Sequence, residues 1–371
     1  MYWKHGQDGG KWMSRQKTVV VAMSGGVDSS VAAYLLKEQG YHVIGVTMQI
    51  WQDTDRQKQE AEGGCCGISA VEDARRVAQV LDIPHYVMNF KREFQTKVIN
   101  YFIREYQIGH TPNPCIACNR YVKWESLLKR SMEIGADYIA TGHYARIRHM
   151  NNGRYAIEQS VTAQKDQSYA LYNLTQEQLA RTMMPIGVYE KDRVREIADE
   201  VGLPVAHKPD SMEICFVPDG DYASYIEEAV GMKSEPGNFV DMQGHVLGRH
   251  RGIIHYTVGQ RKGLNLALGY PAFVARIKLE TNEIVIGQLK DILFGKVYIS
   301  QVNYMSNPDF SENKIYLGKI HYNHKGFGCM VRQAGDDLYE CIFLEPQRAL
   351  TPRQALVLYD GSLIAGGGTI L

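Results

Sequence analysis

The chain has 371 residues, 44% of them hydrophobic and 22% charged, and its 41 basic side chains are balanced by 41 acidic ones. This length predicts two or three domains, and the balanced charge argues against a polybasic nucleic-acid binder, although a local basic face can still contact phosphates. No apolar run approaches the roughly 18 residues that a membrane span needs, and the first 17 residues lack the apolar stretch of a signal peptide. We therefore expect a cytoplasmic, multidomain protein with no membrane contact.

The first half of the chain alternates apolar strand patterns with amphipathic helix patterns. We predict strands over 18–23, 41–48, 84–90 and 136–147, and helices over 28–39, 69–81, 92–107, 121–134, 175–182 and 189–202. Strands that alternate with helices of this length are typical of an α/β fold with a doubly wound parallel sheet. Residues 52–64 are too polar to pack, and we predict a mobile loop there.

The second half is rich in glycine and in short strand patterns. Residues 271–287 indicate two alternating strands around a Thr-Asn turn, and further strands are predicted over 315–322, 328–333, 338–344 and 354–359. These patterns favour a small central domain followed by a C-terminal antiparallel barrel or sandwich, of which we favour the β-barrel. The predicted division is a polar extension over 1–17, a catalytic domain over 18–210, a central domain over 211–287 and a barrel domain over 288–371.

A glycine-rich loop, SGGVDSS, lies between the first predicted strand and the first predicted helix. Glycines let the backbone approach a ligand closely, and the helix N-terminus with its serine hydroxyls favours an anion. Met48 and Gly142 also fall at predicted C-terminal strand ends, where open α/β sheets bind ligands. The candidate nucleotide site is therefore Ser24, Gly25, Gly26, Val27, Asp28, Ser29, Ser30, Met48 and Gly142.

The SGGxDS pattern resembles the pyrophosphate loop of the ATP-pyrophosphatase family, which has an adenine nucleotide alpha hydrolase-like fold. The resemblance implies that ATP adenylates a carbonyl-type oxygen with loss of pyrophosphate, and that Asp28 helps to place Mg²⁺ near the departing phosphates. The competing interpretation is a Gly-Gly turn in which Asp28 only caps a helix.

Seven cysteines occur in the chain, and five of them fall in three short motifs. Cys115 and Cys118 stand three residues apart in TPNPCIACN, and Cys215 lies in DSMEICF. From the residues alone, the first pair can hold half a zinc site, form a redox couple or supply a thiolate. Cys65 and Cys66 have no role that we can derive.

The motifs SGGVDSS, TPNPCIACN, ATGHYAR, KDQSYAL and DSMEICF occur in this order along the chain. As a set they resemble the bacterial tRNA-specific 2-thiouridylase family, over about residues 17 to 371. The resemblance implies ATP-dependent 2-thiolation of the wobble uridine (U34) of tRNAs for lysine, glutamate and glutamine. A cysteine desulfurase or a sulfur-relay protein would deliver the sulfur.

The same resemblance implies roles for the cysteines. Cys215 would carry a persulfide, and Cys118 would attack it or release the sulfur, which leaves a Cys118–Cys215 disulfide for a reductant to reopen. We expect a helix that begins after Asn119 to favour the Cys118 thiolate.

The tRNA-contacting residues implied by the resemblance are Asn113, Pro114, Cys115, Lys165, Asp166, Gln167 and Arg332. Many relatives have Asp in place of Cys115, so an acid role at that position is lost or moved. In the C-terminal motif, only Arg332 can be carried over. Near the cysteines, Arg120, Lys123, Lys129 and Arg130 form either a phosphate-contacting face or a solvated helix face.

Two other interpretations stay open from the sequence. Another ATP pyrophosphatase acting on RNA would share the glycine loop, with Cys115, Cys118 and Cys215 holding an iron–sulfur cluster. Structural zinc fits less well, because no second cysteine or histidine pair stands at finger spacing. A non-catalytic RNA-binding module would need a basic face but no ATP loop. For the interpretation that we favour, we expect no protein-bound metal besides the Mg²⁺ that accompanies ATP.

Overall fold

The computed structural model describes residues 15–50, 68–210, 214–217 and 219–371. The polar loop over 52–64, the cysteines Cys65 and Cys66, and most of the N-terminal extension lie outside these described residues. Within the described ranges, no helix has both the length and the apolar character that a membrane crossing requires.

The N-terminal part is built on a five-stranded sheet in which every neighbouring pair is parallel. Its strands, in spatial order, are β3 (His85–Asn89), β2 (His42–Gln49), β1 (Thr18–Ala22), β4 (Tyr138–Thr141) and β7 (Thr182–Met183). Successive side chains of β1 face opposite sides, so Val19 and Val21 enter one core and Val20 enters the other. Both faces of the sheet are therefore buried, and the predicted doubly wound parallel sheet is confirmed.

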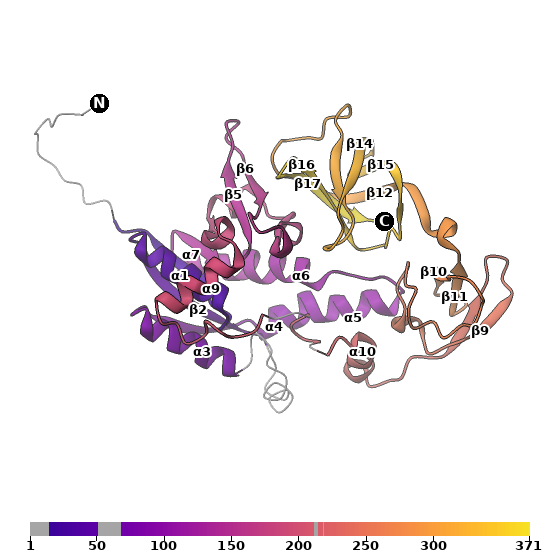
Figure 1. Ribbon diagram of the computed structural model, residues 1–371, viewed down its shortest axis with the longest axis horizontal. Helices are drawn as coiled ribbons and strands as arrows, with labels where there is room; N and C mark the ends of the chain where they lie inside the picture. The colour runs from indigo at the N-terminus through magenta and orange to yellow at the C-terminus, as the bar shows by residue number, and fades with distance from the viewer. Residues whose placement is uncertain (1–14, 51–67, 211–213, 218) are drawn as a thin grey trace, which may run out of the picture.

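Helices cover the two faces of this sheet (Figure 1). One face carries α1 (Val27–Glu38), α3 (Ile68–Val80) and α9 (Lys191–Glu200). The other carries two long helical segments: α4 (Lys91–Phe94), the π-helical η2 (Gln95–Ile99) and α5 (Asn100–Gln107), then α6 (Pro114–Ala117), the π-helical η3 (Cys118–Leu127) and α7 (Leu128–Glu133). A short helix, α8 (Gln176–Ala180), precedes β7.

The cysteine-bearing helix begins earlier than the sequence pattern predicts. The structure starts it at Pro114 rather than at residue 121. Asn113 is the N-cap, because its side-chain Oδ1 accepts a hydrogen bond from the backbone nitrogen of Ile116 at 3.2 Å. Proline is well suited to the first helical position, where its missing N–H costs nothing. Cys118 therefore lies in the second turn of the helix, not before its N-terminus.

The strand predicted over 136–147 is two strands of two different sheets. β4 ends at Thr141, and β5 (Ala145–His149) begins a hairpin with β6 (Tyr155–Gln159). This hairpin joins the C-terminal sheet, where Glu158 of β6 pairs with Leu363 of β17 (Leu363–Ile370). In Figure 1 the hairpin stands out of the parallel layer beside the barrel.

The central part combines α10 (Tyr222–Val230) with a four-stranded sheet in the order β10 (Phe273–Lys278), β11 (Glu283–Gly287), β8 (Gly237–Val240) and β9 (Val246–His250). The C-terminal barrel contains β12 (Leu293–Tyr304), β15 (Leu338–Arg348), β14 (Phe327–Gly335), β13 (Tyr316–Lys319), β16 (Ala355–Asp360) and β17. Antiparallel pairing of β12 with β17 closes it, which confirms the predicted β-barrel.

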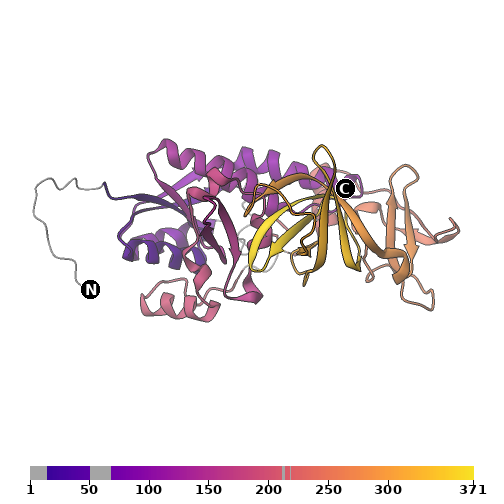
Figure 2. The ribbon, with the colours of Figure 1, turned by 90° about the horizontal axis from the view of Figure 1, so that it is seen from above.

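Short 3₁₀ turns connect these elements: η4 (Ala163–Lys165), η5 (Ser168–Leu171), η6 (Pro185–Val188), η7 (Ile253–His255) and η8 (Leu289–Ile292). Seen from above, the parallel sheet, the barrel and the central sheet follow one another along the long axis (Figure 2). The predicted domain boundaries at 210/211 and 287/288 stay predictions.

Candidate functional site

The glycine loop lies at the switch point of the parallel sheet, directly after β1. Ser29 Oγ accepts a hydrogen bond from the backbone nitrogen of Ser24 at 3.2 Å, and Ser30 Oγ donates to the Gly26 carbonyl at 2.8 Å. Gly25 has a φ of +70°, and a Cβ atom there would lie 2.3 Å from the Ala70 carbonyl oxygen. The loop is therefore tightly folded, and Gly25 is needed for both its backbone conformation and the space it leaves.

Gly142 brings the end of β4 against the same loop. A Cβ atom at Gly142 would lie 2.6 Å from the backbone nitrogen of Ser29 and 2.7 Å from the backbone carbon of Asp28. The ends of β1 and β4 thus meet at the N-terminus of α1, as expected at a switch point where α/β sheets bind ligands. Met48 lies near the end of β2, half-buried against the main core and opposite Met88, so packing alone accounts for its position.

Asp28 is held by two donors that sequence reasoning missed. Tyr144 donates its hydroxyl to Asp28 Oδ1 at 2.7 Å, and Lys191 Nζ donates to the same oxygen at 2.8 Å. Burial raises the pKa of the Tyr144 phenol, and the nearby Asp28 charge raises it further. Tyr144 therefore remains a protonated donor.

Three cations surround a second carboxylate, Asp210. Lys191 Nζ and an Arg195 guanidinium nitrogen each lie 2.8 Å from Asp210 Oδ1, and Lys165 Nζ lies 2.8 Å from Oδ2. Although burial alone would raise it, hydrogen bonds from Lys165 and Lys191 bring the pKa of Asp210 to about 2. With three cations and two carboxylates beside a glycine loop, the site has a net positive charge suited to polyphosphate.

Lys208 also contacts the glycine loop. Lys208 Nζ donates to the Gly25 carbonyl at 3.2 Å and pairs with Asp73 at 2.7 Å. One signal could have found part of this cluster, because Lys191 and Arg195 stand four residues apart and share a face of α9. Asp210 carried no comparable signal.

Cys118 and Cys215 pack against one apolar cluster. Both thiol side chains are partly buried against the main core. Phe216, next to Cys215, has its ring centroid 5.8 Å from that of Phe94 and 5.2 Å from that of Phe102. The helix over 91–107 therefore supports both cysteine-bearing segments.

The expected helix-terminus effect on Cys118 is wrong. Since the helix begins at Pro114, it is Cys115 that lies in its first turn, and Cys115 is exposed. Cys118 opens the π-helical segment instead, and such segments often mark functional sites.

A junction of all three parts of the chain holds the segment before these cysteines. Thr111 donates its hydroxyl to Thr257 of the central part at 3.2 Å and accepts a hydrogen bond at its carbonyl from Gln354 of the barrel at 2.9 Å. Two residues earlier, a Cβ atom at Gly109 would lie 2.8 Å from Ile277 of β10. The direction in which the cysteine loop points is therefore set jointly by the three parts.

The basic residues near the cysteines mostly have partners within the protein. Lys123 Nζ donates to His143 Nε2 at 3.3 Å, Arg130 pairs with Glu93, and the Arg120 guanidinium lies 5.1 Å from the centre of the Tyr121 ring. Burial and then Lys123 lower the pKa of His143, which keeps the imidazole a neutral acceptor. Lys129 is exposed.

The predicted tRNA residues Lys165, Asp166 and Gln167 lie in a segment that contacts residues around the glycine loop. Lys165 contacts Asp210, and Gln167 Oε1 accepts a hydrogen bond from the Tyr144 backbone nitrogen at 2.9 Å. Asp166 accepts a hydrogen bond from Ser168 Oγ at 2.8 Å. The segment thus lies near the nucleotide loop, and any contact that it makes with RNA stays a prediction.

Arg332 stands apart from the other candidates, on β14 of the barrel. Its guanidinium pairs with Glu340 of β15, which also binds Lys296 at 2.9 Å and Tyr298 at 3.0 Å. Hydrogen bonds from Lys296, Tyr298 and Arg332 lower the pKa of Glu340 to about 2. The side chain of Arg332 is 61% exposed, so the guanidinium can still contact a ligand.

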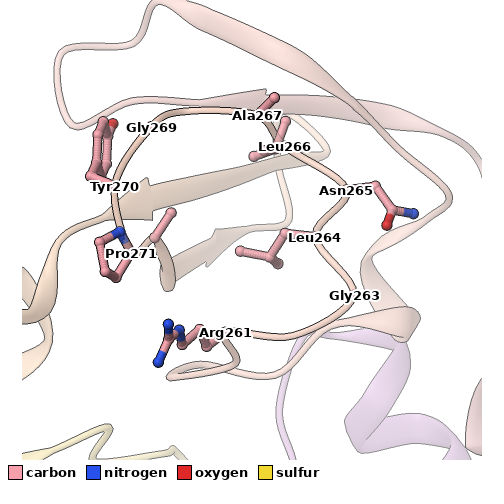
Figure 3. Close-up of a pocket in the computed structure, with 10 residues that line it drawn as sticks. Arg261, Gly263, Leu264, Asn265, Leu266, Ala267, Gly269, Tyr270 and Pro271 are labelled. Atoms are coloured by element: carbon pink, nitrogen blue, oxygen red, sulfur yellow. The ribbon is translucent and has the colours of Figure 1, made fainter.

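Neither a metal cluster nor the loop-lined hollow of the central part coincides with this site within the described residues. Within the described residues, no three or more His, Cys, Asp or Glu side chains gather so as to hold a metal ion, so the iron–sulfur alternative gains no support there. A hollow of about 570 Å³ is lined by Arg261 and by residues 263–267 and 269–272 of the central part (Figure 3). None of its lining residues belongs to the glycine loop or the cysteine segments, so we do not assign it to ATP.

Comparisons with known proteins cover nearly the whole chain. Family models described as "tRNA methyl transferase HUP domain", "tRNA methyl transferase PRC-barrel domain" and "Aminomethyltransferase beta-barrel domain" match residues 17–219, 223–288 and 294–370.

Three curated relatives share the name tRNA-specific 2-thiouridylase MnmA. The chain is 64% identical to the one from Lachnoclostridium phytofermentans, 53% to that from Clostridioides difficile and 54% to that from Acetivibrio thermocellus. Each match covers 96% of this chain and 99%, 99% and 100% of the respective relative. The family models are named for methyl transfer, whereas the relatives are named for thiolation of uridine. Because the identity to the relatives extends over nearly their full length, we take sulfur to be the group that is transferred.

Proposed function

We propose that this chain, which belongs to the tRNA-specific 2-thiouridylase family and is a tRNA sulfurtransferase, uses ATP to thiolate C2 of the wobble uridine (U34) through an adenylated intermediate and a cysteine persulfide. The substrates would be tRNAs for lysine, glutamate and glutamine. We propose the cytoplasm as its compartment, because the mechanism needs thiols that a reducing environment maintains. The observation that carries the proposal is the positively charged glycine-loop site. The helix that bears Cys118 covers the opposite face of the sheet, and the segment over 165–171 connects the two, because Lys165 pairs with Asp210 and Asn119 donates to the Ala170 carbonyl.

The first proposed step activates the uridine oxygen. O2 of uridine attacks the α-phosphorus of ATP, the bond to the β-phosphate oxygen breaks, and pyrophosphate leaves with its electron pair. Charge develops on that leaving group, so preorganised cations stabilise the transition state. Lys191 and Arg195 on α9 support this role, with Lys208 beside Gly25.

Mg²⁺ fits this site as a partner of the phosphates rather than as a resident of a protein cage. Two carboxylates, Asp28 and Asp210, face one another across Lys191. Magnesium commonly takes one or two protein carboxylates together with phosphate oxygens and waters. When bound, it would neutralise phosphate charge, while Asp28 and Asp210 would hold it and Tyr144 would orient Asp28.

The second proposed step transfers sulfur. The terminal sulfur of a Cys215 persulfide attacks C2, and the bond from C2 to the adenylated oxygen breaks with release of AMP. The Cys118 thiolate then attacks Sγ of Cys215, and the electron pair of the sulfur–sulfur bond goes to the uridine sulfur. The products are 2-thiouridine and a Cys118–Cys215 disulfide, which a dithiol reductant reopens. A cysteine desulfurase or a relay protein would reload Cys215.

Cysteine variants test this order of steps. In a reaction with tRNA, ATP and a persulfide donor, Cys215→Ser should still release pyrophosphate but form no 2-thiouridine by mass spectrometry of digested tRNA. Cys118→Ser should accumulate tRNA linked to Cys215 through a bond that dithiothreitol cleaves. Cys329→Ala, at a buried barrel position, is the matched control and should thiolate normally. Normal thiolation by Cys215→Ser would contradict the relay.

A further inference from the structure

One exposed aromatic side chain of the barrel packs against the η5 turn, which contacts the cysteine helix. Tyr322 lies in the loop between β13 and β14, and 40% of it is exposed. Its ring packs edge-on against Tyr169, with centroids 6.3 Å apart and an interplanar angle of 82°. Tyr169 is buried and donates its hydroxyl to the Ala355 carbonyl at 2.7 Å. Tyr322 therefore packs against a buried ring on one side, while part of its side chain remains exposed to solvent.

The support beneath Tyr322 is continuous with the cysteine helix. Tyr169 belongs to η5, which packs against α6, and Asn119 donates its side-chain amide to the Ala170 carbonyl at 3.0 Å. Burial raises the pKa of Tyr322 to about 12, with contributions from the charges of Asp166 and Cys115. Those two candidate tRNA residues thus lie within electrostatic reach of the ring, and the phenol stays neutral.

The same loop supplies a cation. Lys325 is exposed, and no carboxylate of the described residues lies within ion-pair distance of it. An exposed aromatic ring and an exposed lysine in one loop are the two groups with which proteins commonly bind single-stranded RNA. In such proteins the aromatic ring stacks on a base, and the lysine ammonium contacts the neighbouring phosphate.

We propose that Tyr322 is a stacking platform for a nucleotide next to the target uridine, with Lys325 contacting the RNA backbone there. This inference rests on the proposed function and deepens it. A uridine modified at C2 must leave the stack of the anticodon loop, and its neighbour then loses a stacking partner. Tyr322 replaces that partner, so the barrel helps to hold the RNA open over Cys115.

Binding of an anticodon stem-loop tests the platform. The probe is an RNA stem-loop with 2-aminopurine in place of the nucleotide on either side of the uridine. We expect Tyr322→Ala to weaken binding about 5- to 150-fold and to remove the fluorescence quenching at one of the two positions. Tyr322→Trp should keep both the wild-type affinity and the fluorescence quenching. Tyr86→Ala, at a more exposed tyrosine on edge strand β3, is the control and should behave as wild type.

Three outcomes separate the inference from the proposed function. Wild-type affinity and quenching in Tyr322→Ala would overturn the platform, even if the wild-type enzyme thiolates tRNA. Normal RNA binding with impaired sulfur loading would also overturn it, because the loop would then bind the sulfur donor instead. Absence of thiolation by the wild type would refute the proposed function, whatever Tyr322 does. Thermal unfolding of each variant checks that the fold is retained.

Discussion

Lys191 bridges Asp28 and Asp210, with its Nζ atom 2.8 Å from an oxygen of each carboxylate. Asp28 belongs to the glycine loop and Asp210 lies in the segment after α9, so a single ammonium links two parts of the chain that are far apart in sequence. The side chain of Lys191 is only 12% exposed, which makes the arrangement preorganised rather than mobile. A polyphosphate entering this site would compete with the two carboxylates for the same ammonium.

Replacing Lys191 should therefore impair pyrophosphate release more than folding. We expect Lys191→Met to lower the rate of ATP-dependent pyrophosphate release by about 100-fold, because one preorganised cation at the leaving group is lost. Arg193→Met, on the exposed side of the same helix, should change the rate less than about twofold. An assay of pyrophosphate release with saturating tRNA measures both. Equal rates of pyrophosphate release in the two variants would show that Lys191 does not stabilise the leaving group.

Adding a methyl group at Gly142 should damage the nucleotide loop. The new Cβ atom would lie 2.6 Å from the Ser29 backbone nitrogen, so either β4 or the N-terminus of α1 must shift. We expect Gly142→Ala to cost about 1–3 kcal/mol and to raise the KM for ATP. Gly295→Ala is the control, since a Cβ atom there meets nothing within 4 Å. ATP titrations measure the KM and urea unfolding measures the stability of both variants. If Gly142→Ala and Gly295→Ala had the same KM and the same stability, the prediction would be contradicted.

Part of the site could be predicted because local sequence encodes it. A glycine loop between a strand and a helix indicates an anion site through backbone geometry alone, and the structure puts it at the switch point with Gly142. The cations Lys191 and Arg195 were not foreseen, because on a polar helix they resemble a solvated face. Their role depends on Asp28 and Asp210, and the meeting of these groups is a tertiary contact.

One error in the predicted elements has the same cause. The apolar run over 136–147 looks like one strand, but β5 pairs with β6, and β6 reaches β17 more than 200 residues later. Such non-local pairing leaves no local signal. The helix start at Pro114 was recognisable in principle, because Asn followed by Pro is a common N-cap and first helical pair.

Asp210 should make stability depend on acid pH. Since its folded-state pKa of about 2 lies below the ordinary value of 3.8, the carboxylate stabilises the fold above that value, and this contribution is lost as the pH falls toward 2. The difference in Tm between wild type and Asp210→Asn should thus be largest above about pH 4 and should shrink toward about pH 2. Glu312→Gln, an exposed carboxylate, should show a small and constant difference. A constant difference for Asp210→Asn would contradict the assigned ion pairs.

Asn113 has two roles that one pair of substitutions separates. Its Oδ1 atom caps the cysteine-bearing helix, and the resemblance to the family also assigns it to the target base. Asn113→Ala should cost about 1 kcal/mol in unfolding free energy through loss of the cap. Asn113→Asp keeps a capping oxygen and adds a charge that suits a helix N-terminus, so it should restore stability. If Asn113 acts only as a cap, thiolation recovers with it. If the side-chain NH₂ donates to the uridine, Asn113→Asp stays stable but keeps a raised KM for tRNA. We expect this second result because Cys115, in the helical turn that Asn113 caps, is exposed.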